Sequence, residues 1–214
     1  MGVPTPPNTR SVKISDDERG GWSSDRRRRD APPKRPADLS VRSQVLRPSD
    51  RLRYSPGSLL VIVSASVPEA NGFAQRVVES SGSVLSRHKV RGLLAGRVPE
   101  EELEARSAEL LDAAVVKRLD AGETVVIVPE GLDAGERERY VRMAAASRRP
   151  CHLILLETRP DQVAQEVRAP LNQLRRRLDA GELGADGFQT VLRLGGASLS
   201  ELRRIVFQPA PRDE

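Results

Sequence analysis

The stretch that decides the fold is LLVIVSASVPEANGFAQRVV, residues 59–78. Its first five residues, LLVIV, form an apolar run with three β-branched side chains, which is typical of a strand buried on both faces of a parallel sheet. Residues 71–78 place apolar side chains at helical spacing and predict an amphipathic helix. Residues 64–70 therefore connect a buried strand to a helix, where a nucleotide-binding α/β domain keeps its phosphate-binding loop.

Strands and helices alternate along the rest of the chain. Apolar runs predict strands at residues 83–85, 124–128, 153–156 and 191–194, with 205–207 as a further edge strand. Helices are predicted at residues 98–119, 133–146, 158–179 and from 198 onward. This alternation predicts an α/β fold with three layers and a mainly parallel five-stranded sheet.

Several helix starts carry recognisable end signals. Pro99 suits the first position of the long helix. Capping-box-like pairs are predicted for Asp133 with Glu136, for Thr158 with Asp161, and for Ser198 with Glu201; Pro160 lies in the first turn of the second of these helices.

The composition divides the chain into unequal parts. Residues 1–56 hold 8 of the 16 prolines and carry 13 basic against 7 acidic side chains, whereas the remaining 158 residues carry 22 basic and 23 acidic ones. The excess positive charge therefore belongs to the amino-terminal segment. We predict a disordered basic tail at residues 1–53, an α/β domain at 54–210 and a terminal tail at 211–214.

The arginine run at residues 26–29 allows two interpretations. It could contact nucleic acid or an acidic partner, with residues 26–35 as the contact, or it could be a solvated polar tail flanked by Asp25 and Asp30. The second interpretation is favoured, because Trp22 is the one nearby aromatic side chain that could stack on a base.

Several classes of protein are excluded or disfavoured. The single cysteine, Cys151, excludes an internal disulfide and a cysteine-based metal cluster, and its place in an apolar strand predicts a buried, inert thiol. The chain begins without an apolar segment of signal-peptide length, and its apolar runs are too short to span a membrane. We expect a soluble cytoplasmic protein with no membrane contact.

The segment after the first strand departs from the phosphate-binding pattern GxxxxGK[ST]. That pattern uses glycines to curl backbone amides around phosphates, lysine to meet the β- and γ-phosphates, and a hydroxyl to hold Mg²⁺. The corresponding residues here are SASVPEAN, residues 64–71. Ser64 and Glu69 stand in place of the glycines, Ala70 in place of the lysine and Asn71 in place of the hydroxyl.

Two further features weaken this loop. Pro68 removes an amide donor, and Glu69 adds a carboxylate where the ligand would be anionic. What remains is the positive end of the helix, which contributes only about 0.3–1 kcal/mol to the binding of an exposed anion. We treat the following residues as the relic of a phosphate loop: Ser64, Ser66, Glu69, Ala70, Asn71 and Gly72.

Over about residues 51–208, the chain resembles small P-loop kinases and ATPases. The nearest resemblance is to the polynucleotide-kinase-like AAA-family ATPases of actinobacteria. The segments that carry it are YSPGSLLV at 54–61, VLSRHKVR at 84–91, LDAGETVVIV at 119–128, ERER at 136–139, HLILLE at 152–157 and RRIVF at 203–207.

The resemblance also implies further losses. His88 stands near the family's aspartate after the second strand, and Val128 stands where an acid ends the third strand, with Glu130 two residues on. Arg137 matches an arginine of the following helix. Arg168 begins an arginine-rich region, residues 168–177, that overlies the family's lid, whose arginines contact phosphates in active relatives.

For the remaining candidate residues, structural interpretations are favoured over functional ones. The triplet at residues 175–177 is expected to form a solvated helix face, His152 to pack at a strand edge and His88 to lie on the surface. No nucleophile motif or metal-ligand spacing is visible around either histidine. We expect no catalytic residue, no metal site and no resident cofactor.

Three hypotheses about function remain. The first is a degenerate P-loop protein, a pseudoenzyme that binds or regulates an unidentified protein partner. The second is an active ATP-dependent kinase or ATPase with an atypical loop, which would use Mg²⁺ and ATP with Glu130 and the lid arginines. The third is a nucleic-acid-binding protein that acts through its basic tail.

Overall fold

The structure, a computed structural model, describes residues 40–41 and 51–209. The expected contact at residues 26–35, Trp22, most of the predicted tail and residues 211–214 lie outside the described residues.

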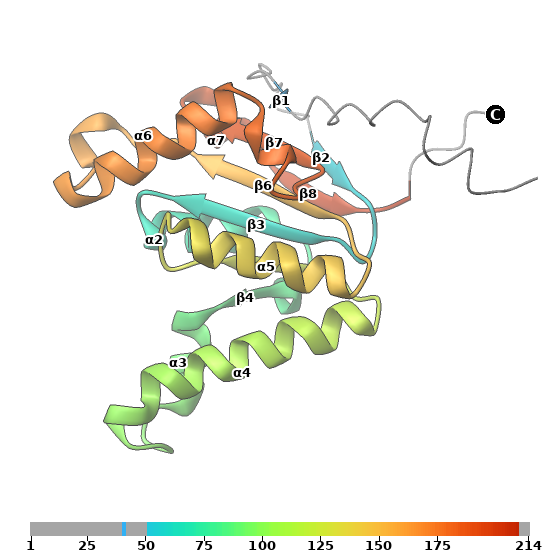
Figure 1. The fold of residues 1–214 in the computed structure, drawn as a ribbon, viewed down its shortest axis with the longest axis vertical. Coiled ribbons are helices and arrows are strands. Elements are labelled where there is room, and N and C mark those ends of the chain that lie inside the picture. Colours follow the sequence, from blue (N-terminus) through green and yellow to red (C-terminus); the bar gives the residue numbers. More distant parts are fainter. Residues whose placement is uncertain (1–39, 42–50, 210–214) are drawn as a thin grey trace, which may run out of the picture. The chain divides into compact units, whose positions relative to one another are not determined.

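Parallel strands form the centre of the domain (Figure 1). In spatial order they are β7 (Thr190–Leu194), β6 (Cys151–Leu156), β3 (Leu59–Ser64), β5 (Val125–Val128) and β4 (Val84–Ser86). All four neighbouring pairs run parallel, and the two-residue strand β1 (Ser40–Val41) joins the edge at β7, also in parallel. This arrangement confirms the predicted α/β fold class with its mainly parallel sheet of five strands.

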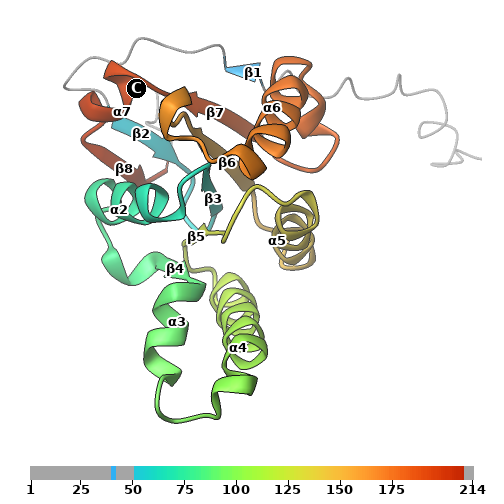
Figure 2. The same ribbon diagram turned by 90° about the vertical axis from the view of Figure 1, so that its left-hand side faces the viewer.

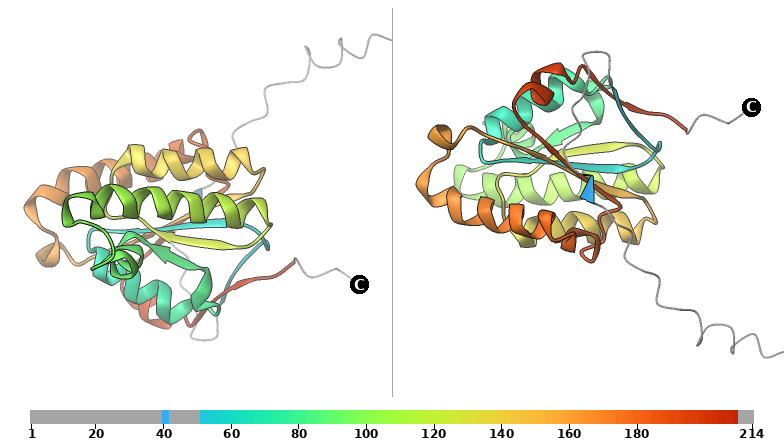
Figure 3. Two further views of the ribbon diagram at one scale, coloured as in Figure 1. Left: turned by 90° about the horizontal axis from the view of Figure 1, so that it is seen from below. Right: turned by 90° about the horizontal axis from the view of Figure 1, so that it is seen from above.

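Helices cover both faces of the sheet. The helices are α2 (Val67–Val77), α3 (Arg87–Leu94), α4 (Glu100–Asp120), α5 (Ala134–Ala146), α6 (Gln165–Asp179) and α7 (Ala197–Glu201), with 3₁₀ turns η2 (Ser81–Ser83), η3 (Pro160–Gln162) and η4 (Glu182–Gly184). Helix α2 packs on one face, while α4, α5 and α6 pack on the other (Figures 2 and 3). This double coverage explains why the strand sequences are continuously apolar rather than alternating.

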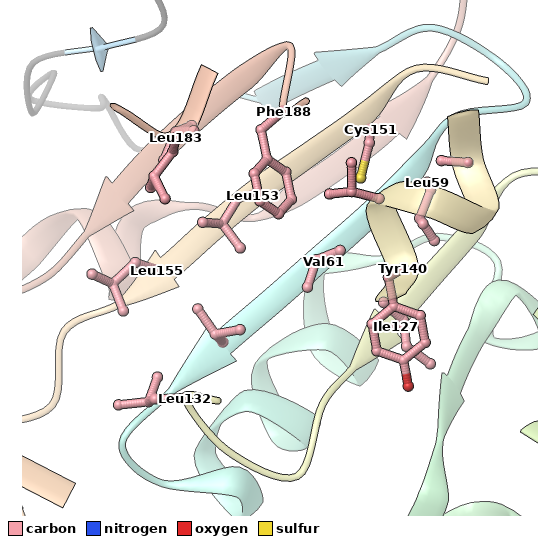
Figure 4. Close-up of a cluster of buried hydrophobic side chains, with 14 of the residues drawn as sticks. Leu59, Val61, Ile127, Leu132, Tyr140, Cys151, Leu153, Leu155, Leu183 and Phe188 are labelled. Carbon is pink, nitrogen blue, oxygen red and sulfur yellow. The ribbon is translucent and has the colours of Figure 1, made fainter. Parts of the chain in front are cut away.

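The strands divide their side chains between two apolar cores. Leu59 and Val61 of β3 belong to the core under α4, α5 and α6, whereas Leu60 and Ile62 belong to the core under α2. Figure 4 shows the first core, where Tyr140 of α5 packs beside the strands. The alternation follows from the two-residue period of a strand.

A second, smaller sheet lies outside the main one. Strand β2 (Arg51–Tyr54) pairs in parallel with β8 (Arg204–Phe207). The apolar segment at residues 205–207 was predicted as an edge strand of the main sheet. It instead pairs with β2, and Tyr54 and Ile205 share the core of α2.

Several predicted helix starts are wrong. Helix α2 begins at Val67, four residues before the predicted start at residue 71, because Ser66 already caps it. Pro99 is the residue that precedes α4 rather than its first residue. Helix α3 was not predicted; it begins after Ser86, whose hydroxyl accepts the amide of Lys89 at 3.4 Å.

The three predicted capping boxes have different outcomes. Asp133 caps α5, and its Oδ2 accepts the amide of Glu136 at 2.8 Å. Thr158 caps no helix, because its hydroxyl bonds to Ser64 and Glu69 instead. Ser198 lies inside α7, whose cap position is held by Gly196 at a positive φ of 56°.

Among the residues that the structure describes, no helix is both long enough and apolar enough to cross a lipid bilayer.

Candidate functional site

The topology directs attention to the carboxyl ends of β3 and β6. These two strands pair side by side, with Ser64 opposite Leu156. The helix that follows β3 packs on one face of the sheet, and the helix that follows β6 packs on the other. In open parallel sheets, ligands bind at the carboxyl ends of strands where the connections reverse in this way.

The connection from β3 to α2 is too short to form a phosphate cradle. Only Ala65 and Ser66 lie between the last residue of the strand and the first residue of the helix. The amide of Ser66 donates to Ser64 Oγ at 3.1 Å, and the amide of Glu69 donates to Ser66 Oγ at 3.4 Å. Serine hydroxyls thus accept amide hydrogens that a phosphate would require.

The carboxylate of Glu69 occupies the centre of this connection. Its Oε2 accepts the hydroxyl of Ser64 at 3.0 Å and the hydroxyl of Thr158 at 2.8 Å. The two hydroxyl oxygens lie 3.0 Å apart, and both residues are buried, at 3% and 4% exposure. The chain therefore places its own anion beside the amino end of α2, the position at which α/β domains bind anionic ligands.

The other relic residues take no part in this cluster. Ala70, in place of the lysine, is 1% exposed and packs into the core of α2. Asn71 donates from Nδ2 to the carbonyl of Val67 at 3.1 Å, within its own helix. Gly72 has no atom near the position of an added Cβ, so no close backbone approach requires glycine there.

A second carboxylate, Glu157, directly follows β6. Arg175 Nε donates to both of its oxygens at 3.1 Å, and Arg193 pairs with Oε1. Burial acts to raise the pKa of Glu157, but the hydrogen bonds and charges of the two arginines outweigh it and hold that pKa below its usual value. Arg175 therefore does not belong to the solvated helix face predicted for residues 175–177.

Sequence reasoning missed the part played by Glu157, Thr158 and Arg193. The available signal was position, because polar residues that directly follow a buried parallel strand lie at the ligand-binding edge of the sheet.

Glu130, which follows β5 in the chain, belongs to an ion-pair network around Arg87. Arg87 Nη1 lies 3.1 Å from Glu130 and 2.6 Å from Glu104, and its Nη2 lies 3.9 Å from Glu136. Burial raises the pKa of Glu136, partly opposed by the positive charges of Arg87 and Arg139. Within the described residues, no three His, Cys, Asp or Glu side chains are grouped to hold a metal ion.

The two histidines and the cysteine occupy different environments. His88 is exposed, as predicted. His152 lies on the interior strand β6 at 6% exposure; its Nδ1 is 2.9 Å from Thr190 Oγ1, and its Nε2 is buried without a partner among the described residues. Burial lowers the pKa of His152 to about 4 and raises the pKa of Cys151 to about 12. The predicted burial of the thiol is confirmed, and its inertness stays a prediction.

The structure separates both candidate arginines from the relic loop. Arg137 is 5% exposed and lines a cavity between α5 and α6, whose walls contain no residue of the segment 64–72. Arg168 is exposed, and its Nε donates to the carbonyl of Val163 at 3.3 Å. The residues predicted from sequence therefore do not form one site: Ser64, Ser66 and Glu69 lie together after β3, Arg137 lines its cavity, and Arg168 lies on the surface.

Comparisons with known proteins give little further guidance. No protein-family model matches the chain. No curated protein matches it. One solved structure, from work on the PezAT chromosomal toxin–antitoxin system of the human pathogen Streptococcus pneumoniae, is similar with a TM-score of 0.41 and 12% identity, over 70% of this chain and 71% of that chain. A similarity of that size assigns no activity.

Proposed function

We propose that this protein is a pseudoenzyme: a P-loop-like scaffold, related to the polynucleotide-kinase-like ATPases, that binds or regulates a protein partner without binding ATP. The observation that carries the proposal is the carboxylate of Glu69, which accepts the hydroxyls of Ser64 and Thr158 beside the amino end of α2.

The electrostatics support the absence of nucleotide binding. A phosphate at this position would meet the negative charge of Glu69 at short range, and Ala70 stands in place of the lysine that would offset it. The nearby guanidinium groups of Arg175 and Arg193 are already paired with Glu157. Against this repulsion, the amino end of α2 offers only about 0.3–1 kcal/mol to an exposed anion.

The geometry of the connection supports the same conclusion. A phosphate cradle needs several consecutive backbone amides that point at the ligand. Here the connection has two residues, Pro68 has no amide hydrogen, and the amides of Ser66 and Glu69 bond to serine hydroxyls. Neutralising Glu69 would therefore leave the cradle unformed.

Isothermal titration of the full chain with Mg·ATP tests the proposal. We expect no micromolar binding of Mg·ATP to the wild type, since the hydroxyls and the carboxylate beyond the carboxyl ends of β3 and β6 bond to one another. The variant Glu69→Gln, in which the repulsive charge is removed but the short connection is kept, should also show none. Micromolar binding to the wild type would reject the pseudoenzyme proposal, and binding to Glu69→Gln alone would assign the block to charge rather than to geometry.

The two other hypotheses have direct tests. An active kinase or ATPase would turn over labelled ATP and lose that turnover in Glu130→Ala, yet Glu130 pairs with Arg87 in the structure. A tail-mediated nucleic-acid contact would give salt-dependent retardation of DNA or RNA that removal of residues 1–50 abolishes. That contact stays a prediction from sequence.

A further inference from the structure

Arg137 is a buried cation that meets no carboxylate at ion-pair distance within residues 51–209. It is 5% exposed. All the hydrogen bonds found for its side chain come from Nη1, which donates to the carbonyl oxygens of Leu132 and of Asp133, the latter at 3.1 Å. Burial, and next the neighbouring charge of Arg177, lower the pKa of Arg137, and the negative charges of Asp133, Asp186 and Glu138 only partly oppose this shift.

This arrangement differs from that of two partly exposed arginines of the domain. Arg87 has three carboxylates around it, and Arg175 has Glu157. Burying a charge costs several kcal/mol unless an opposite charge and good hydrogen bonds offset it. Two backbone carbonyls offset this cost only in part, so the guanidinium of Arg137 retains an attraction for an anion.

A cavity of about 150 Å³ opens beside this side chain. It lies between the start of α5 and α6, which run next to each other on the same face of the sheet (Figure 2). Its walls are Leu132, Asp133, Ala134, Arg137, Pro170, Gln173, Leu174 and Arg177. The apolar walls lower the local dielectric constant, which strengthens any charge interaction inside the cavity.

The other two charges in the walls already have partners. Asp133 caps α5 by accepting the amide of Glu136 at 2.8 Å, so the helix end compensates its carboxylate. Arg177 pairs with Asp186 at 2.6 Å and with Glu182 at 3.5 Å. Within residues 51–209, Arg137 therefore has no carboxylate at ion-pair distance, although the negative charges of Asp133, Asp186 and Glu138 act on it through space.

We propose that this cavity binds an oxyanion, a carboxylate or a phosphate group, through the guanidinium of Arg137, with Gln173 and Arg177 at its rim. Arginine suits this ligand, because its planar fork matches two oxygens of one group. A volume of about 150 Å³ is below the usual range for drug-sized ligands, so one anionic group fits and a whole nucleotide does not.

The anionic group can be the end of a larger molecule. A more open groove of about 650 Å³ runs along α6 and shares Pro170, Gln173 and Arg177 with the cavity. A carboxylate on a partner protein and a free small anion share the chemistry that Arg137 would recognise, and the experiment below separates these two sources.

The test is a titration of the full chain, at constant ionic strength, with inorganic phosphate, acetate and a glutamate-rich peptide in separate experiments. We expect saturable binding of at least one of them at millimolar concentration or below. Gln173→Glu places a carboxylate at the rim of the cavity, where it can pair with Arg137, and should weaken the binding by roughly tenfold or more. Gln165→Glu makes the same chemical change on the same helix outside the cavity and should leave the affinity unchanged.

Each outcome of these titrations either identifies the bound group or overturns the proposal. Tighter binding of the peptide than of acetate identifies a protein-borne carboxylate, and tighter binding of phosphate identifies a phosphate group. The proposal is overturned if none of the three probes saturates, or if Gln173→Glu binds as the wild type does. Gln173 is exposed, so its substitution leaves the core intact. Glu69 lies in no wall of this cavity, so micromolar binding of Mg·ATP that persists in Gln173→Glu would reject the proposed function and not this site.

Discussion

The buried polar groups at the two ends of β6 differ in their hydrogen-bond partners and in their charge. Near its amino end, His152 is buried with one ring nitrogen that has no hydrogen-bond partner among residues 51–209, and burial lowers its pKa. Beyond its carboxyl end, Glu157 and Thr158 belong to networks in which carboxylates meet arginines or hydroxyls. The same strand thus carries a neutral group that its surroundings keep neutral and a charged group that its surroundings keep charged.

This difference bears on function as well as on stability. The carboxyl end of a parallel strand is where an α/β domain places its ligand, and here its polar groups bind one another. An edge whose donors and acceptors are already satisfied offers little to an incoming ligand, since each new hydrogen bond must first break an existing one.

The largest expected effect comes from acidifying the protein. The pKa of His152 is about 4 in the folded chain, below the ordinary value of 6.5, so the unfolded chain takes up a proton between these values and the folded chain does not. The contribution of His152 to the free energy of unfolding is complete above pH 6.5. It falls by up to about 3 kcal/mol as the pH drops toward 4. Urea unfolding at several pH values measures it.

The variant His152→Phe isolates this contribution from that of the carboxylates. Its stability should change with pH between 6.5 and 5 less than that of the wild type, because both chains share every other titrating group. Parallel pH profiles for the two chains would show that burial at this end of β6 does not suppress protonation.

The next effect comes from the other end of the strand. Glu157→Leu should lower the free energy of unfolding by about 2–3 kcal/mol, because it leaves Arg175 and Arg193 partly buried without their shared carboxylate. Chemical denaturation measures the loss. Glu182→Ala, which removes a 59% exposed partner of Arg177, is the control and should cost less than about 0.5 kcal/mol. Equal losses in the two variants would mean that the Glu157 cluster is no stronger than a surface pair.

Glu69→Gln should have an intermediate effect of about 1 kcal/mol. Glutamine keeps an oxygen for Ser64 and Thr158 but loses the charge that strengthens both hydrogen bonds. The matched control is Glu79→Gln, which makes the same change at the exposed residue just after α2 and its cap. A gain of stability in Glu69→Gln would mean that the hydrogen bonds from Ser64 and Thr158 do not offset the cost of holding the carboxylate there.

The smallest effect is expected at Gly72, and it should be stabilising. Gly72 lies in the interior of α2, is exposed and has no neighbour near the position of an added Cβ. Gly72→Ala should therefore raise the free energy of unfolding by about 0.5–1 kcal/mol, measured by thermal or urea unfolding. A loss instead would reveal that this part of the relic loop needs the small residue for a contact of its own.

The sequence predicted the central sheet well because buried parallel strands have a distinctive pattern. The runs at residues 59–63, 125–128 and 153–156 are apolar on both faces, and each proved to lie in an interior strand, although the strand predicted from residue 124 begins at Val125. Local signals at the ends of helices were less reliable. Asp133 capped its helix as predicted, whereas Thr158 used its hydroxyl in a contact 94 residues away along the chain.

The candidate site was predictable only in part, because its decisive contacts join distant segments. The erosion of the phosphate loop can be read from Ser64, Glu69 and Ala70 alone. That Glu69 would meet Thr158 depends on the pairing of β3 with β6, which no local pattern specifies. That Arg137 borders a cavity and forms no ion pair within residues 51–209 likewise depends on which segments of α5 and α6 pack together.

The short step from β3 to α2 has one more consequence. Because Ala65 and Ser66 are the whole connection, the backbone there has no further residues that could form a longer loop. Exchanging side chains can alter the charge beside the amino end of α2, but it cannot create additional free backbone amides. Engineering this protein to hold a triphosphate would therefore require extra residues inserted between strand and helix, or the unwinding of the first turn of α2.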